Sequence, residues 1–273
     1  MGLVTEASGP ALQAVGLSKA YSVGHLRPRR VPAVSDLSLE VQRGEVFGYL
    51  GPNGSGKTTT LKLLLGLIRP DAGSGSILGF PLDHPGWRFR TGYLPENPYL
   101  YDYLTPLEYL DYVGRLFGMK AAARRQRSAE LLQRLGLEPA ANMPLRRFSK
   151  GMLQRAGLAQ ALLNDPELVF LDEPMSGLDP VGRRLVRNLI QELRQRGCTV
   201  FFSTHILPDA EALCDRVALL RGGRLVRVGR MDEIASVSGS RLEVLATGVP
   251  VEAWAGLPGP AEARRTVGER ACR

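Results

Sequence analysis

The chain has 273 residues, 44% of them hydrophobic, which is ordinary for a globular protein and sufficient for a buried core. The longest apolar run, at residues 61–68, is far shorter than the roughly 20 residues that a membrane span needs, so we expect no part of the chain to cross a bilayer. The formal net charge of +8 allows a nucleic acid or an anionic membrane surface as partner and selects neither, because solvated faces are the simpler explanation of the short basic clusters at 27–30 and 124–127.

The N-terminus and the cysteines indicate the compartment. Residues 1–10 contain no basic region followed by an apolar stretch, so we expect no secretory signal. Cys198, Cys214 and Cys272 are odd in number and lack the spacing of metal ligands, which fits a reducing compartment. The sequence therefore predicts a cytosolic chain.

The first predicted elements surround a glycine-rich loop. Residues 37–50 alternate in polarity and then become apolar, which predicts two strands, the second ending at Leu50. The glycine loop follows, and a helix is predicted from about Lys57. The order strand, glycine loop, helix is the setting that phosphate-binding loops require.

Residues 100–150 are predicted to be mainly helical. Thr105 is placed as an N-cap, with Pro106 at the first helical position and Glu108 three residues after the cap, which is the pattern of a capping box. A second helix is predicted near 124–135, ending at Gly136. A helical segment therefore interrupts an α/β core.

The second half of the chain contains short apolar runs. Residues 167–174 (ELVFLDEP) and 198–205 (CTVFFSTH) are rich in Val and Phe and bounded by polar residues, as buried parallel strands are. Two further strands around Gly222 and Gly223 predict a hairpin. Residues 237–273 are expected to form a small or partly disordered tail, in which only 241–247 (RLEVLAT) resembles a strand.

The glycine loop matches the pattern G-x-x-x-x-G-K-[ST] at every position. Its glycines permit close backbone approach to phosphates, Lys57 reaches the outer phosphates, and Thr58 ligates magnesium. We therefore predict that the chain binds a nucleoside triphosphate together with Mg²⁺. The residues predicted to bind are Gly51, Pro52, Asn53, Gly54, Ser55, Gly56, Lys57, Thr58 and Thr59.

Acidic and imidazole groups follow two of the buried strands. Asp172 ends the first strand, where a carboxylate can hold magnesium, and Glu173 follows it, where it can orient or deprotonate an attacking water. His205 ends the other strand and can donate to a γ-phosphate. Taken alone, Glu173 is also explained as a solvated acid and His205 as a structural histidine.

These motifs, in this order, resemble the nucleotide-binding subunits of ABC transporters over about residues 11–235. GPNGSGKT resembles the Walker A motif of that family, LVFLDE its Walker B motif, SGLDP (176–180) its D-loop, and STH its switch histidine. The resemblance implies an α/β fold, with a P-loop NTPase core built on a parallel sheet, an N-terminal antiparallel β subdomain and a helical insert at about 100–160. It also implies one ATP-binding domain at 11–236, and that Tyr21 stacks on adenine and Asp179 belongs to the nucleotide site.

A second stretch, FSKGM at 148–152, stands where the family has its LSGGQ signature. It opens a predicted helix, and the free NH groups of a helix N-terminus bind anions. The resemblance implies a head-to-tail dimer in which Ser149 and Gly151 of one chain close over the ATP held by Lys57 of the other. Lys150 replaces the usual glycine and adds positive charge, so we expect this second phosphate cradle to remain functional.

A further departure is Glu96 in GYLPEN, where the family has its Q-loop glutamine. A carboxylate accepts hydrogen bonds from magnesium-bound water, but it cannot donate as an amide does. We expect Glu96 to keep a role in metal sensing and membrane coupling, with an altered metal dependence. LPEN together with SKGM is similar to the ABC-2 type exporters, which favours export over import.

The leading hypothesis is a dimeric ATPase that drives transport, through a separate permease, at the cytoplasmic face of the cell membrane. Glu173, His205 and Lys57 are its predicted catalytic residues, and Thr58, Glu96 and Asp172 its metal-binding residues. The partner subunit is an identical or closely related chain. An alternative is a soluble ABC-type ATPase that acts on nucleic acid or ribosomes; we do not expect nucleic acid as a partner, because such members carry two domains or a long coiled coil. A non-hydrolysing scaffold is the third possibility, and the presence of all three catalytic residues disfavours it.

Overall fold

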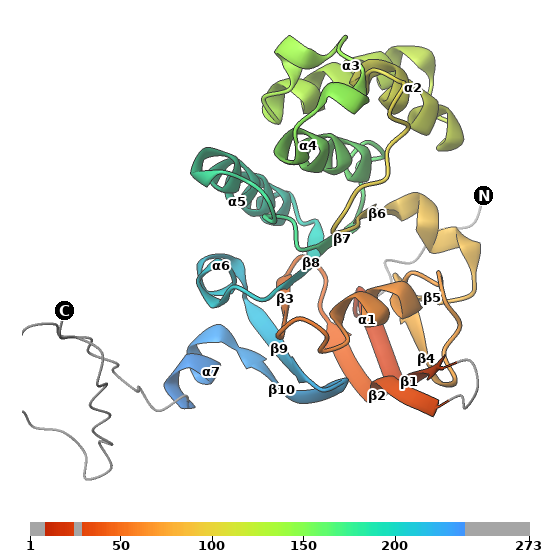
Figure 1. Ribbon diagram of the computed structural model, residues 1–273, viewed down its shortest axis with the longest axis vertical. Helices are drawn as coiled ribbons and strands as arrows, with labels where there is room; N and C mark the ends of the chain where they lie inside the picture. The colour runs from red at the N-terminus through yellow and green to blue at the C-terminus, as the bar shows by residue number, and fades with distance from the viewer. Residues whose placement is uncertain (1–8, 25–28, 238–273) are drawn as a thin grey trace, which may run out of the picture. The chain divides into compact units, whose positions relative to one another are not determined.

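The structure is a computed structural model that describes residues 9–24 and 29–237. These residues form two β-sheets and a set of helices, three of which (α2, α3 and α4) gather at one end in Figure 1. Residues 238–273 lie outside the described part, so the predicted tail and its strand-like segment 241–247 stay predictions.

The central element is a six-stranded sheet in the order β10-β9-β3-β8-β7-β6. Neighbours from β9 to β6 are parallel, and β10 pairs antiparallel with β9 in the hairpin expected around Gly222 and Gly223. Strands β3, β7 and β8 are buried along both faces, and residues 168–171 of β7 and 200–202 of β8 are apolar, as in parallel strands covered on both sides. The strands are β3 (Val46–Leu50), β6 (Thr91–Leu94), β7 (Leu168–Asp172), β8 (Thr199–Thr204), β9 (Arg216–Arg221) and β10 (Arg224–Arg230).

The register of these strands assembles the site. Asp172, the last residue of β7, lies opposite Ser203 of β8, and Leu50, the last residue of β3, lies opposite Thr204. Because parallel strands end at the same edge of a sheet, the three segments that follow them start side by side. The glycine loop, Glu173 and His205 therefore meet at one edge.

A second, four-stranded antiparallel sheet has the order β2-β1-β4-β5 and confirms the expected N-terminal β subdomain. Helix α1 (Lys57–Leu64) lies between the two sheets: its Leu61 packs in one core cluster with Leu17 of β1 and with Phe170 and Phe201 of the central sheet. The strands of this sheet are β1 (Leu12–Val23), β2 (Arg29–Val41), β4 (Ala72–Ile77) and β5 (Phe80–Pro81).

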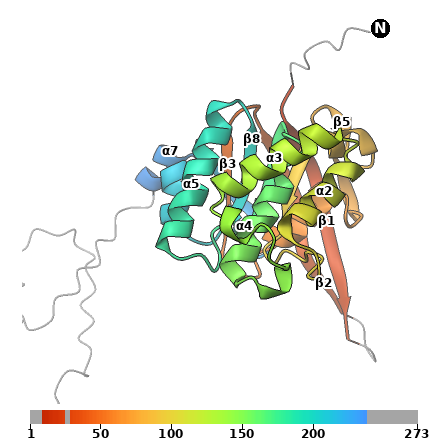
Figure 2. The same cartoon turned by 90° about the horizontal axis from the view of Figure 1, so that it is seen from above.

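The opposite face of the central sheet carries the helical insert and α5, which Figure 2 shows in front of the strands. Val186 and Ile190 of α5, with Leu158 of α4, pack in one core cluster with Val200 of β8. The capping box is confirmed: the Thr105 hydroxyl accepts from Glu108 N at 3.3 Å, and the Glu108 carboxylate accepts from Thr105 N at 2.8 Å. The insert comprises α2 (Pro106–Leu116), α3 (Ala121–Arg134), α4 (Lys150–Ala161) and the 3₁₀ turns η2 (Glu138–Ala140) and η3 (Leu145–Arg147).

The remaining elements complete the core, and one boundary differs from its prediction. Helix α3 begins at Ala121, earlier than expected, because Lys120 is extended and three alanines, the best helix formers, follow it. Within the described residues, no helix is long and apolar enough to span a membrane. The remaining helices are η1 (Pro85–Arg90), α5 (Pro180–Gln195), α6 (Leu207–Leu213) and α7 (Met231–Val237).

Candidate functional site

The glycine loop Gly51–Thr58 connects β3 to α1, as the sequence predicts, and wraps the Lys57 side chain. Lys57 is only 6% exposed, and its Nζ donates to the Gly51 carbonyl at 2.7 Å. The loop backbone thus holds the Lys57 ammonium group at the N-terminus of α1. A cation at a helix N-terminus makes a strong anion site, because the free NH groups of the first turn add to it.

Glycine is required at two positions of the loop by close approach. A Cβ on Gly51 would lie 2.4 Å from Ser55 Oγ and 2.8 Å from the Leu220 carbonyl, and a Cβ on Gly56 would lie 2.5 Å from the Ala33 carbonyl. Gly56 also has φ +104°, which L-residues rarely adopt. The backbone can therefore curve tightly around a phosphate chain, and the cradle fits a nucleoside triphosphate.

The Asp172 carboxylate is held between two hydroxyl groups. Ser203 Oγ donates to one carboxylate oxygen at 2.5 Å, and Thr58 Oγ1 donates to the other at 3.1 Å. Asp172 is 1% exposed, and burial raises its pKa above the ordinary value of 3.8, against the lowering effect of the two hydrogen bonds. A buried anion beside a hydroxyl is a hard oxygen pair of the kind that Mg²⁺ prefers.

No group of three or more His, Cys, Asp or Glu side chains that could hold a metal ion by itself occurs among the described residues. Mg²⁺ needs no such group, because it keeps several waters and takes one or two carboxylates plus phosphate oxygens. Glu96 is exposed and lines the same cavity, and its charge helps to raise the pKa of Asp172. The residues present therefore fit Mg²⁺ bound together with a nucleotide.

Glu173 connects the lysine and the histidine. Its carboxylate lies 3.3 Å from Lys57 Nζ and 3.0 Å from His205 Nδ1. The residue has φ +48°, so its backbone turns sharply as it leaves β7 and directs the side chain across the edge of the sheet. His205 is exposed along 46% of its side chain, whereas Glu173 is 9% exposed, which leaves the imidazole free to reach a ligand.

These groups surround a cavity of about 460 Å³. Its lining contains most of the predicted phosphate-binding residues, whereas Gly51, Pro52 and Ser55 of the loop, and Asp172 at the end of β7, do not line it. The cavity is lined by Ala33, Asn53, Gly54, Gly56, Lys57, Thr58, Thr59, Glu96, Glu173, Ser176 and His205.

Five further predicted residues, outside the glycine loop and β7, do not line this cavity either, although all lie within the described ranges. Tyr21 is on β1 and is 40% exposed. Ser149 is the N-cap of α4, where its hydroxyl accepts from Met152 N, and Lys150 and Gly151 form the first turn of that helix. Asp179 caps α5 by accepting from Gly182 N at 2.8 Å. Their part in nucleotide binding stays a prediction.

Three residues of the site were missed from the sequence. Ser203 donates to Asp172 and also accepts from Glu173 N at 3.1 Å. Gln154 is fully buried in α4 and donates to the Glu173 carbonyl at 3.3 Å. Ala33, on β2, closes the cavity from the antiparallel sheet. Only Ser203 left a signal, a polar residue directly after the apolar run 200–202 in a buried strand.

Comparison with known proteins identifies the family. A family model described as ABC transporter matches residues 34–176. An uncharacterized ABC transporter ATP-binding protein of Nostoc sp. is 51% identical over 234 residues, which cover 85% of this chain and 70% of that protein. This chain belongs to the ABC transporter family. The resemblance inferred from the motifs is thereby confirmed.

Other relatives place this ABC chain among ATP-binding proteins. The Nod factor export ATP-binding protein I of Ralstonia nicotianae is 39% identical over 231 residues, covering 83% of this chain and 69% of that protein. An uncharacterized ABC transporter ATP-binding protein of Synechocystis sp. is 51% identical, and the chain spans 62% of its length.

Solved structures confirm the fold of the ABC cassette. An ATP-binding subunit of an ABC transporter superimposes with a TM-score of 0.75 at 35% identity, covering 84% of this chain and 93% of that one. A dimeric ATP-binding cassette in a post-hydrolysis state, bound to ADP and phosphate, superimposes with a TM-score of 0.74 at 27% identity, covering 81% of this chain and 98% of that one. The predicted α/β P-loop fold is confirmed.

Proposed function

We propose that this ABC cassette hydrolyses ATP as a dimer and thereby drives export through a separate membrane permease. The observation that carries the proposal is the contact of Glu173 with both Lys57 and His205 at the mouth of the glycine-loop cavity. This arrangement supplies a carboxylate to activate water, a cation for the phosphates and an imidazole that reaches the γ-position, which are the groups that phosphoryl transfer needs.

Each side chain of the cavity then has a definite task. Lys57 exchanges its contact with the loop carbonyl for the outer phosphates of ATP, and Glu173 orients and deprotonates the attacking water. Thr58 and Asp172 would hold Mg²⁺, which neutralises charge that develops on the phosphate oxygens. Ser203 orients Asp172 and also accepts from the NH of Glu173, so one hydroxyl positions both acidic residues.

The proposed dimer is supported by the position of the signature segment. Ser149 and Gly151 do not line the cavity of their own chain, yet they open a helix of 12 residues whose first NH groups form an anion site. A second copy in a head-to-tail arrangement brings this site over the γ-phosphate held by the first. ATP then links the two chains, and hydrolysis releases them.

The proposed permease contact lies on the helical insert. Two neighbouring cavities of about 350 and 220 Å³ share Phe117 and Asn164 as lining residues. In the segment that leads into α2, Tyr99 is 94% and Tyr103 is 77% exposed. Aromatic side chains are enriched at protein interfaces. Docking here would hold the chain at the cytoplasmic face of the cell membrane.

The nucleic-acid alternative is not favoured by the charge distribution. In the basic cluster at 124–127, Arg124 is bound to Asp111 at 2.7 Å. Arg127 is bound to Glu130 at 2.9 Å. Two members of the cluster are thus neutralised within the chain, whereas a phosphate-binding face presents free cations. The direction of transport rests on the ABC-2 motifs and on a relative named for Nod factor export.

Affinity capture from detergent-solubilised membranes tests the proposal. The bait is the Glu173→Gln variant with ATP, because loss of the carboxylate keeps ATP unhydrolysed and the dimer closed. The matched control is the same variant carrying Lys57→Ala, which cannot hold the nucleotide. Recovery of a polytopic membrane protein supports the transporter function, and recovery of ribosomes or nucleic acid in its place contradicts it.

A further inference from the structure

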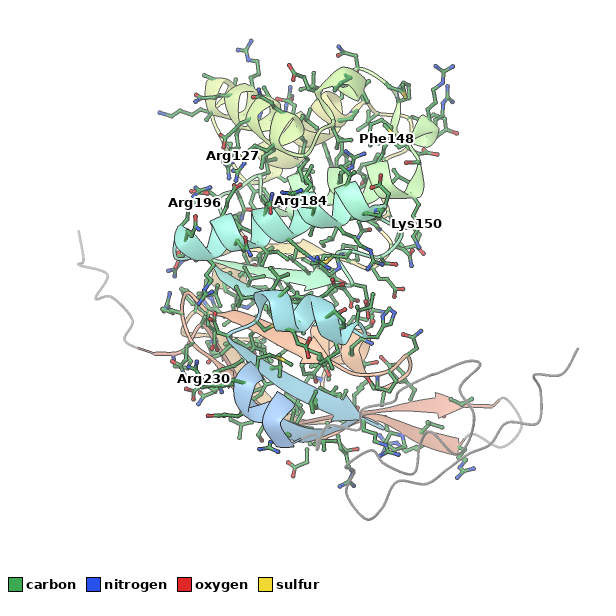
Figure 3. The ribbon with its side chains drawn as sticks, turned by 90° about the vertical axis from the view of Figure 1, so that its left-hand side faces the viewer. Arg127, Phe148, Lys150, Arg184, Arg196 and Arg230 are labelled. Atoms are coloured by element: carbon green, nitrogen blue, oxygen red, sulfur yellow. The ribbon has the colours of Figure 1, made fainter. Side chains whose placement is uncertain are left out.

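The first turn of α4 packs directly on the D-loop of its own chain. A Cβ built on Gly177 would lie 2.9 Å from Cδ and 3.0 Å from Cε of Lys150, so the methylene stem of this lysine runs across the exposed face of the glycine. On the next residue, a Cβ on Gly151 would lie 3.3 Å from a methyl group of Leu178. Figure 3 shows Lys150 at the start of α4, beside the first turn of α5.

The D-loop leads from this contact back to the catalytic carboxylate. Ser176 lines the ATP cavity, and its backbone NH donates to the Glu173 carbonyl at 3.0 Å. The same carbonyl accepts from the buried Gln154 side chain, which belongs to the second turn of α4. The first two turns of α4 therefore contact both ends of the segment 173–178. Gln154 donates to the Glu173 carbonyl at one end, and Lys150 and Gly151 pack on residues 177–178 at the other.

Lys150 makes this link through carbon atoms rather than through its charge. The side chain is exposed, and no hydrogen bond or ion pair of its ammonium group occurs among the described residues. Gly177 has φ +71°, a conformation that glycine leaves easily because it has many alternatives. A stem laid across it removes some of those alternatives, whereas the glycine that usually stands at position 150 would leave the loop uncovered.

We propose that Lys150 is a positioning residue that couples the two ATP sites of the dimer: its stem holds the D-loop against α4, so that binding of the partner's nucleotide by α4 orders Glu173 in the same chain. The inference rests on the proposed head-to-tail dimer. Coupling of this kind is reciprocal, so ATP at either site favours ATP at the other. Hydrolysis then depends on ATP concentration with a Hill coefficient above 1.

Two substitutions separate the stem from the charge. Lys150→Ala removes both, and Lys150→Met keeps a stem of similar length without the ammonium group; both residues form helices well, so α4 is retained. We expect Lys150→Ala to lower the Hill coefficient below that of the wild type, because the coupling through the stem, typically about 5-fold or more, is lost while ATP still links the two chains. Lys150→Met should keep the cooperativity and need a severalfold higher ATP concentration for half-saturation, because a cation near the phosphates is gone.

The experiment measures ATP hydrolysis by the purified full chain across ATP concentrations, with thermal melts to verify folding. Lys120→Ala, an exposed lysine at the N-cap of α3, is the matched control and should behave as the wild type. A wild-type Hill coefficient of 1, an unchanged coefficient in Lys150→Ala, or an equal loss in Lys150→Met overturns the proposal. Absence of turnover in the wild type would instead contradict the proposed function.

Discussion

Ser203→Ala isolates the hydroxyl that positions both acidic residues. Ser203 is fully buried, and its Oγ donates to the Asp172 carboxylate at 2.5 Å. A hydrogen bond to a charged group contributes about 1.5 to 3 kcal/mol to stability. The substitution also removes the hydroxyl oxygen that accepts a hydrogen bond from Glu173 N. This second loss adds little to the loss of stability, because Glu173 N also donates to the Ser203 carbonyl at 3.2 Å. The substitution should therefore lower Tm by about 3 to 12 °C, at about 2 to 4 °C per kcal/mol for a chain of this size.

Urea and thermal unfolding of the nucleotide-free protein measure this loss. The matched control is Ser128→Ala, because Ser128 is 2% exposed and its buried hydroxyl has no hydrogen-bond partner among the described residues. Removing an unsatisfied hydroxyl is expected to be neutral or stabilising. Ser203→Ala should also need more Mg²⁺ for half-maximal ATP hydrolysis, because Asp172 loses its orientation. Equal stability of the two variants would refute the account of Ser203.

Two further changes test charges at the site, and a third tests a buried ion pair between α6 and α5. Burial raises the pKa of Asp172 above 3.8, so the ionised carboxylate costs stability at neutral pH, and this cost disappears as the pH falls below 3.8. Asp172→Asn should therefore raise the Tm of the nucleotide-free protein at pH 7 and give no gain near pH 3.8. The same substitution should abolish ATP hydrolysis. A neutral amide at position 96 removes a negative charge beside the metal, so Glu96→Gln should change the Mg²⁺ dependence of hydrolysis and its stimulation by the permease; unchanged values for both would contradict the proposed role. Asp209 is 1% exposed and pairs with Arg187 at 2.6 Å. Asp209→Ala should lower the free energy of unfolding, measured in urea, by about 3 kcal/mol, the lower end of the range for broken buried pairs, because the Arg187 side chain is 38% exposed. A loss below about 1 kcal/mol would show that water already screens the pair.

Features that depend on neighbours in the sequence were predictable. The capping box at Thr105 and the glycine loop before α1 each involve only a few neighbouring residues, so the sequence pattern alone predicts the local structure. The gathering of Glu173 and His205 at one edge was also predictable, because parallel strands end together. Comparison with relatives and solved structures confirms the family and the fold, while the domain boundaries and residue roles stay predictions.

Features that depend on packing were not predictable. Ser203 reaches Asp172 only through the register of β7 against β8, and a sequence shows strands without their register. Gln154 reaches the Glu173 carbonyl because α4 packs on the central sheet, and nothing in the helix pattern selects it. The stem of Lys150 across Gly177 likewise requires two residues 27 positions apart in the sequence to pack against each other.

Sedimentation of the Glu173→Gln variant, with and without ATP and Mg²⁺, tests the central claim of a nucleotide-linked dimer most directly. We predict a monomer without ATP and a dimer with it, and we predict that Lys57→Ala or Gly151→Arg, added to this variant, each prevents the dimer. A monomer at saturating ATP, or a dimer that Gly151→Arg leaves intact, would contradict the claim that the signature segment of one chain closes the ATP site of the other.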